Sequence, residues 1–243
     1  MRRSHRSVGV VAASFTTSVV GVTAVSGWAA AASTAKSEYQ AALKAAAAQN
    51  VHYVSQAVEQ GVGLKVIGDT GKTSGSVVLQ VINGSTTESL KVILVGSTGY
   101  LRGNDAALQK VLGLTVAQSA TYTNKWLSFP TSNTSLAELV SGLRDADVAS
   151  ELEMTGPYTF GAAKTIDGQA THAINGTAAT SSGTKIHIVL YVNSSGRPVE
   201  EITNPKAKSS SIQGTVTFSK WGEPTHPKAP ASSVALVPLL PAA

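Results

Sequence analysis

The sequence predicts an α+β fold: a long antiparallel β half-barrel curled around a helical insert, with an apolar cavity between the sheet and the helices. Only 14% of the residues are charged, and Ser, Thr, Gly and Val are abundant, which favours strands with polar outer faces over a helical bundle. Segments in which apolar residues alternate with period two stand on both sides of a helical middle. One curled sheet satisfies that order with short connections, and a closed barrel with the helices outside is the competing arrangement.

The first 32 residues have the layout of an export signal. Three arginines stand at positions 2, 3 and 6, and no charged residue follows until Lys36. An apolar stretch then leads to Ala30-Ala31-Ala32, where signal peptidase would cleave. Because the uncharged stretch exceeds the ~20 residues of a membrane-spanning helix, retention as an N-terminal anchor is the alternative. We therefore expect an exported protein, either secreted or held at the cell envelope by an uncleaved helix.

The chain beyond the signal is long enough for one domain with a sizeable core. We place that domain at residues 33–230, because the composition becomes Pro-rich and apolar in the remaining segment, 231–243.

Charge and cysteine content exclude several classes of partner. Cleavage after residue 32 would remove three arginines and no acidic residue, which lowers the net charge from +5 to +2. No cluster of Lys and Arg with interleaved aromatics is present, so we expect no nucleic-acid partner. The chain contains no cysteine, which excludes disulfides and thiolate-bound metals. We expect neither a cofactor nor a metal.

The first half of the predicted domain is one helix followed by strands. Residues 38–49 are Ala-rich and predict the helix. From Val51 the apolar period changes to two, and the strands that it predicts are residues 51–58, 64–67, 76–82, 88–95 and about 100–103. Asn83-Gly84 predicts a tight hairpin, since both residues tolerate positive φ. These strands should form an antiparallel meander.

The middle of the chain predicts helices. Asn104 can cap a helix that ends at Gly113, and residues 115–122 predict a second, shorter one. After a brief strand at 125–130, Asn133 or Thr134 can cap a third helix. On this third helix four apolar residues would share one face: Leu136, Leu139, Val140 and Leu143.

Strands resume in the last part of the domain, near residue 151 or 158. The candidates are residues 159–165, 168–174, 185–192, 199–203 and 211–218, and the turns between them are predicted at Asn175-Gly176, Ser182-Gly183 and Ser195-Gly196. Beyond Trp221 the prolines exclude further helix or sheet. The last ten residues, 234–243, are apolar, so we expect them to lie along the sheet or to occupy an apolar groove.

No motif in the sequence predicts catalysis. His172 and His187 fall on adjacent predicted strands and could meet, but a hydrolase built on either would need a nucleophile within hydrogen-bond reach. The four acidic residues near the end of the third helix lack the spacing of a calcium loop, so we expect a solvated acidic face at Asp145, Asp147, Glu151 and Glu153. The sequence therefore predicts a protein that is not an enzyme.

Several short motifs stand in a fixed order between residues 38 and 230. The most distinctive are Gly99-Tyr100-Leu101-Arg102-Gly103, then Asn124-Lys125-Trp126-Leu127-Ser128-Phe129-Pro130, Ser195-Gly196-Arg197-Pro198-Val199 and the run from Val216 to Pro224. In this order they resemble the LppX/LprG group of mycobacterial and related actinobacterial lipoproteins. The chief difference is Trp28, which stands where a lipoprotein of the group carries its acylated cysteine. Without that thiol no diacylglycerol can be attached.

The resemblance implies a fold similar to that of the LolA/LolB lipoprotein carriers, in which an antiparallel half-barrel wraps around helices and encloses an apolar cavity. It also implies binding of an acyl lipid or lipoglycan and its movement in the cell envelope, with an envelope membrane or a transporter as a further partner. We expect the cavity to be lined by residues from the helical middle and the strands beside it: Tyr100, Leu108, Val111, Leu112, Trp126, Leu136, Leu139, Val140 and Leu143.

An alternative from a different class is an envelope interaction or sensor domain. In that case the protein's own side chains would fill the cavity, and the apolar C-terminal tail would dock on a partner or close the cavity. Bulky side chains meeting at the centre of the cavity would favour this alternative.

Overall fold

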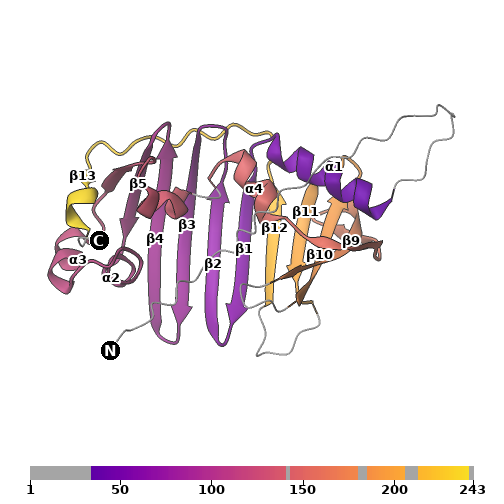
Figure 1. Cartoon of the computed structure of the whole chain (residues 1–243), viewed down its shortest axis with the longest axis horizontal. Helices are drawn as coiled ribbons and strands as arrows, with labels where there is room; N and C mark the ends of the chain where they lie inside the picture. The colour runs from indigo at the N-terminus through magenta and orange to yellow at the C-terminus, as the bar shows by residue number, and fades with distance from the viewer. Residues whose placement is uncertain (1–33, 141–142, 180–184, 206–212, 241–243) are drawn as a thin grey trace.

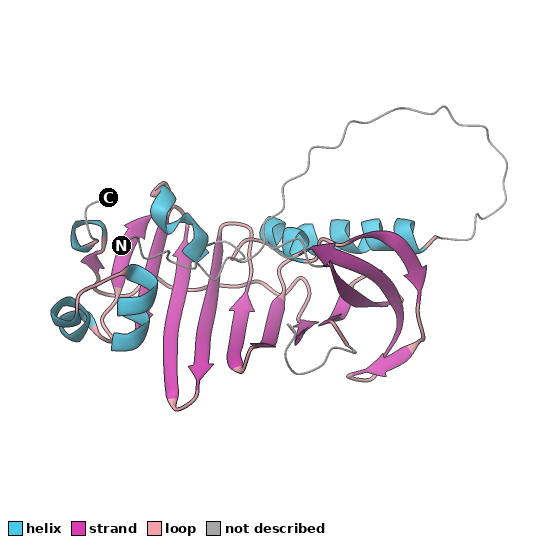
Figure 2. Ribbon diagram, turned by 60° about the horizontal axis from the view of Figure 1, so that its bottom comes forward, coloured by secondary structure: helices cyan, strands magenta, loops and turns pink. Residues whose placement is uncertain are grey.

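The computed structural model describes residues 34–140, 143–179, 185–205 and 213–240, and the predicted export signal and its cleavage site lie outside these ranges. The described strands form a single 13-stranded sheet with an open order, from β13 at one edge to β7 at the other. Figure 1 shows this sheet face on, and Figure 2 shows it curling most strongly at its β9–β11 end. The predicted fold class, a curled antiparallel half-barrel with a few helices, is confirmed, and the closed barrel is excluded.

The N-terminal half is the predicted helix and meander. Its elements are α1 (Ala35–Ala47), β1 (His52–Glu59), β2 (Val62–Asp69), β3 (Ser74–Asn83), β4 (Thr86–Val95) and β5 (Thr98–Gly103). Helix α1 begins after Thr34, which forms a capping box with Ser37. The β3–β4 hairpin lies one residue later than predicted: Asn83 pairs with Thr86, and the left-handed residue is Gly84, at φ 58°.

The middle of the chain is helical as predicted, with one difference. Its elements are α2 (Asp105–Leu112), α3 (Val116–Tyr122), β6 (Leu127–Pro130), the 3-10 helix η1 (Thr134–Val140) and α4 (Asp145–Glu151). The Asn104 side chain accepts a hydrogen bond from the backbone N–H of Ala107 at 3.0 Å, and Gly113 ends α2 at φ 67°. The third helix is shorter than predicted, because η1 ends before Leu143 and α4 follows as a separate helix.

The C-terminal half completes the sheet. Its elements are β7 (Thr155–Phe160), β8 (Lys164–Ile166), β9 (Gln169–Ala179), β10 (Lys185–Asn193), β11 (Pro198–Thr203), β12 (Gln213–Ser219), β13 (Val234–Ala235) and η2 (Val237–Leu239). The turn predicted at Asn175-Gly176 is wrong, because both residues pair with β10 inside β9. A Cβ at Gly176 would collide with the side chain of Met154, so this glycine permits close packing on a strand.

The prediction that no sheet or helix follows Trp221 is also wrong. Strand β13 pairs in parallel with β6, Val234 with Leu127 and Ala235 with Ser128, and the short helix η2 follows. Residues 231–237 contain no proline. The backbone N–H groups of Val234 and Leu236 are therefore free to donate to the carbonyls of Trp126 and Ser128.

The helices cover the two ends of the sheet and form two separate cores. The insert cluster, at the β4–β6 end, holds α2, α3, η1 and the C-terminal tail. The second cluster, at the β9–β12 end, holds α1 and α4. The single helical insert predicted from the sequence is therefore divided, since α4 leaves η1 and packs against α1 at the other end.

Candidate binding face

One face of the sheet carries both helix-covered cores. Leu79 of β3 packs on the insert cluster and pairs with Val66 of β2, which pairs with Ser55 of β1. Ser55 pairs with Val216 of β12, and Val216 packs on the second cluster. Because side chains opposite one another in an antiparallel ladder point to the same side, this helix-bearing face runs without interruption from one cluster to the other.

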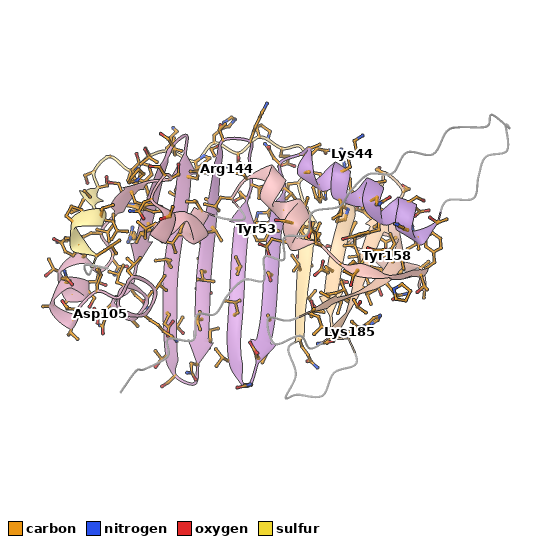
Figure 3. The ribbon with its side chains drawn as sticks, in the orientation of Figure 1. Lys44, Tyr53, Asp105, Arg144, Tyr158 and Lys185 are labelled. Atoms are coloured by element: carbon orange, nitrogen blue, oxygen red, sulfur yellow. The ribbon has the colours of Figure 1, made fainter. Side chains whose placement is uncertain are left out.

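Between the two clusters the helix-bearing face is apolar and half-buried. We call this region the central stripe, and its members on β2 and β3 are Leu64, Val66, Val77, Leu79 and Val81. Tyr53, labelled in Figure 3, lies beside the stripe on β1, and its ring covers Gly68, where any side chain would collide with it. Thus β2 and β3 present a row of apolar side chains that remain partly exposed to solvent.

Six of the nine residues predicted to line a cavity come together in the insert cluster. Five of them are buried and Leu139 packs on the cluster from its edge; the buried five are Leu108, Leu112, Leu136, Val140 and Leu143. Helix α2 is held over the sheet by an ion pair at its last turn, in which the Lys110 ammonium lies 2.7 Å from the Glu88 carboxylate of β4. The helix face inferred from the sequence is therefore the face that meets the sheet.

The other three predicted lining residues lie elsewhere. Tyr100 precedes Leu101, which is buried in the insert cluster, so Tyr100 points to the opposite face of β5, where it pairs with Ile93 and Ser128. Val111 is 39% exposed on α2. Trp126 is half-buried just before β6 and does not join the cluster. These three residues therefore lie outside the insert cluster.

The interior of the insert cluster is filled by bulky side chains. Eight of the largest fully buried side chains of the described structure belong to it: Leu94, Leu101, Leu108, Leu127, Phe129, Leu143, Leu236 and Val92. Leu236 comes from the C-terminal tail, whose last described residues, Leu239 and Leu240, pack beside it. The apolar tail therefore both lies along the sheet and occupies an apolar groove, the two arrangements considered from the sequence.

Two open hollows lie away from the insert cluster. One, of about 220 Å³, lies where the tail leaves β12, and its walls include His52, Asp69 and Ser76. The Asp69 carboxylate is 2.7 Å from the Nδ1 atom of His52 and 3.5 Å from the Ser76 hydroxyl. In the described structure the serine thus contacts the acid rather than the imidazole. The other hollow, of about 340 Å³, lies at the ends of β1, β11 and β12.

The two strand histidines do not form a site together. His172 pairs with Val192 and His187 with Thr177, so five positions of register separate them along β10. The Nε2 atom of His172 instead contacts the Glu38 carboxylate of α1, which brings β9 against that helix. Among the described residues no group of His, Asp and Glu is arranged to hold a metal ion.

A buried acid on the helix-bearing face is a feature that sequence reasoning missed. Glu201 of β11 is only 8% exposed and pairs with Val216 and Leu190, two members of the second cluster's face. Burial, together with a smaller contribution from the negative charge of Glu151, raises the pKa of this carboxyl to about 7. Its neighbour Glu200 points to the other face and pairs with Lys164 at 2.9 Å. The two adjacent glutamates differ only through the alternation of the strand.

Tyr39 of α1 is a buried member of the second cluster and connects that helix to the chain after α4. Its hydroxyl donates to the carbonyl of Leu152 at 3.2 Å and accepts from the N–H of Met154 at 2.7 Å, and its ring stacks on Tyr158 at 5.0 Å. Burial raises the pKa of Tyr39 to about 12. This tyrosine therefore stays neutral and fixes α1 to the chain that links α4 to β7.

The architecture is similar to that of a solved mycobacterial protein. LprF from Mycobacterium bovis superposes with a TM-score of 0.54 at 16% sequence identity, over 82% of this chain and 97% of LprF. At that identity the similarity shows a shared fold.

Two other solved structures are less similar. A chain of the MucA/MucB complex from Pseudomonas aeruginosa superposes with a TM-score of 0.40 at 11% identity, over 80% of this chain and 58% of that one. A LolA superfamily protein from Nitrosomonas europaea gives a TM-score of 0.26 at 14% identity, over 81% and 96% of the two chains. The sequence matches no protein-family model and no curated protein.

Within the described ranges, no helix combines the length and the apolar character needed to cross a bilayer.

Proposed function

We propose that this protein binds the acyl chains of a lipid or lipoglycan on its helix-bearing face and carries that lipid within the cell envelope without chemical change. The observation that supports this most directly is the central stripe, a half-buried apolar floor that runs from the insert cluster toward the second cluster. The LprF-like fold and the sequence resemblance to the LppX/LprG group agree with the proposal.

The dimensions and chemistry of the stripe suit a long acyl chain. The strands β4, β3, β2, β1 and β12 are consecutive neighbours, and at about 4.8 Å per strand they span about 20 Å. Each methylene removed from water contributes about 0.8 kcal/mol. A chain laid across the strands would therefore gain several kcal/mol before its ordering cost.

Export to the envelope is part of the proposal. The uncharged N-terminal stretch predicts either a cleaved signal or an anchor, and the site needs an apolar cargo that membranes supply. Trp28 in place of the acylated cysteine then makes the protein a carrier that is free of a lipid anchor of its own.

Native mass spectrometry of the full chain, purified from an actinobacterial host and followed by organic extraction, tests the proposal. A stoichiometric extra mass that extracts as lipid is expected. Val66→Glu should abolish it, because a carboxylate in the stripe would have to be desolvated beneath the acyl chain.

Ile67→Glu is the matched control, since Ile67 is the half-buried, β-branched neighbour on the opposite face of β2. Equal loss in both variants, or a wild-type protein that carries no lipid and takes up none when offered phospholipid or glycolipid, would contradict the proposal.

The second candidate function is an envelope interaction or sensor domain without a lipid cargo. The filled interior of the insert cluster favours it, because the protein's own leucines occupy the space beneath α2 and η1. The same mass measurement separates the two candidates, since this one requires a clean apo mass.

A further inference from the structure

The C-terminal tail is attached to the sheet by few contacts. Beyond Thr225, whose hydroxyl donates to the carbonyl of Thr70 at 3.3 Å, the next hydrogen bond that the structure shows is from the N–H of Val234 to the carbonyl of Trp126 at 2.9 Å. Leu236 N–H then donates to Ser128 at 2.9 Å, and the Gln118 side chain donates to the carbonyl of Leu239 at 3.2 Å. The segment between Thr225 and Val234 runs past the upper ends of the strands from β12 to β13, as the yellow loop in Figure 1.

Leu236 is the one fully buried side chain among residues 226–240 of the described tail. Leu236 is fully buried, whereas Val234 and Val237 on either side of it are 40% and 43% exposed. Leu239 and Leu240 add partial contacts to the insert cluster. The tail thus consists of a mostly exposed segment, residues 226–233, and an apolar end, residues 234–240, that we call the plug.

The plug occupies space enclosed by the predicted lining residues. Leu236 belongs to the same buried cluster as Leu108, Leu112, Leu136 and Val140, and Val77 and Leu79 of the central stripe pack against that cluster. Every other buried member comes from β4–β6 or from the segment 107–143 that covers them. Leu236 alone comes from the C-terminal tail, where the two-residue edge strand β13 is the segment's only pairing with the described sheet.

We propose that the slot under α2 and α3 that holds Leu236 is an acyl-chain site, and that residues 234–240 are its resident occupant, displaced when a lipid chain extends into it from the central stripe. This inference rests on the proposed function and adds a regulation to it. A leucine side chain and an acyl chain are interchangeable apolar fillers for the same slot, so the tail and the lipid compete.

An engineered disulfide can lock the plug. Ser128 and Ala235 are directly opposite in the β6–β13 pairing, and both lie on the face away from Leu236. The chain has no cysteine of its own, so the double variant Ser128→Cys/Ala235→Cys has one possible pairing. The probe is a dansyl-labelled long-chain fatty acid, titrated against the full-length double variant in its oxidised and reduced forms.

We expect oxidation to weaken probe binding at least tenfold and reduction to restore it, while the Ser128→Cys single variant responds to neither treatment. Leu236→Ser should bind the probe several-fold more tightly than the wild type. Hydrogen exchange gives an independent readout, because the amides of Val234 and Leu236 should lose protection when the probe binds the wild type.

Equal binding by the oxidised and reduced double variant, with unchanged protection at Val234 and Leu236, would overturn the competition while leaving lipid binding intact. Failure of every variant and of the wild type to bind the probe or the lipids would overturn the proposed function itself.

Discussion

Glu201 is an acidic residue buried on an apolar face of the sheet, where charged side chains are normally excluded. A carboxyl that is 8% exposed on an apolar face is disfavoured in its charged form by desolvation, and here a second acid, Glu151, adds repulsion. With the pKa raised from 4.5 to about 7, the folded state binds the proton more tightly than the unfolded chain. The free energy of unfolding must therefore fall as the pH rises from about 4.5 to about 7.

Glu201→Gln should remove this penalty. We expect the variant to exceed the wild type in free energy of unfolding by an amount on the order of 2–3 kcal/mol at pH 8, and the two to converge at about pH 3, where the wild-type carboxyl is protonated in both states. Urea unfolding at both pH values measures the difference. Glu200→Gln is the control, and it should give no gain at pH 8 because it loses the ion pair with Lys164. A gain for Glu201→Gln that is the same at both pH values would contradict the explanation.

At the scale of elements, η1 is the one that the proposed function depends on most. It is a short 3-10 helix, and its residues Leu136, Leu139 and Val140 reach the insert cluster. Short 3-10 segments have poorer hydrogen-bond geometry than α-helices, so packing holds η1 in place and a small change in packing should be felt.

Leu139→Glu tests that dependence. Leu139 lies at the edge of the insert cluster, so a carboxylate there would disturb an acyl chain more than it disturbs the core. We expect at least a tenfold loss of affinity for a fatty-acid probe, measured by fluorescence titration. Val111→Glu on the exposed side of α2 introduces the same charge and should leave binding unchanged; unaltered binding by Leu139→Glu would remove η1 from the site.

On the scale of the whole molecule, the two helix-covered ends and the half-buried apolar middle set the expected thermodynamics of lipid binding. If the stripe and the slot receive an acyl chain, affinity should rise with chain length by up to about fourfold per methylene, from about 0.8 kcal/mol each. Binding should also show a negative heat-capacity change. Calorimetric titration with saturated fatty acids of increasing length measures both, and an affinity that is independent of length would mean that the head group is recognised instead.

Local chemistry accounts for the elements that the sequence predicted well. The cap at Asn104 and the left-handed Gly113 fix both ends of α2 through backbone groups within a few residues. The meander from β1 to β5 follows from period-two alternation and tight turns, which also depend on neighbours in sequence. The face of α2 and η1 that is buried follows from helical periodicity, which is why six of the nine predicted lining residues meet in one cluster.

The predictions that failed concern residues whose conformation or burial depends on contacts with segments far away in the sequence. Asn175-Gly176 has the composition of a turn, but β10 pairs across it and Met154 needs the space above the glycine. Tyr100 was placed beside the helices, and only the burial of its neighbour Leu101 shows which side of β5 faces them. The departure of α4 to the α1 end likewise depends on packing between segments about a hundred residues apart.

By itself, the sequence determined the fold class, the N-terminal helix and meander, and the absence of cysteine chemistry, because periodicity, caps and composition act locally. Only the tertiary structure decided that the helices divide between two ends, that Glu201 is buried, and that Leu236 fills the insert cluster. These outcomes depend on contacts between surfaces that are far apart in the chain. Glu201 and Leu236 become buried only when the sheet has curled and β6 has paired with β13 of the tail.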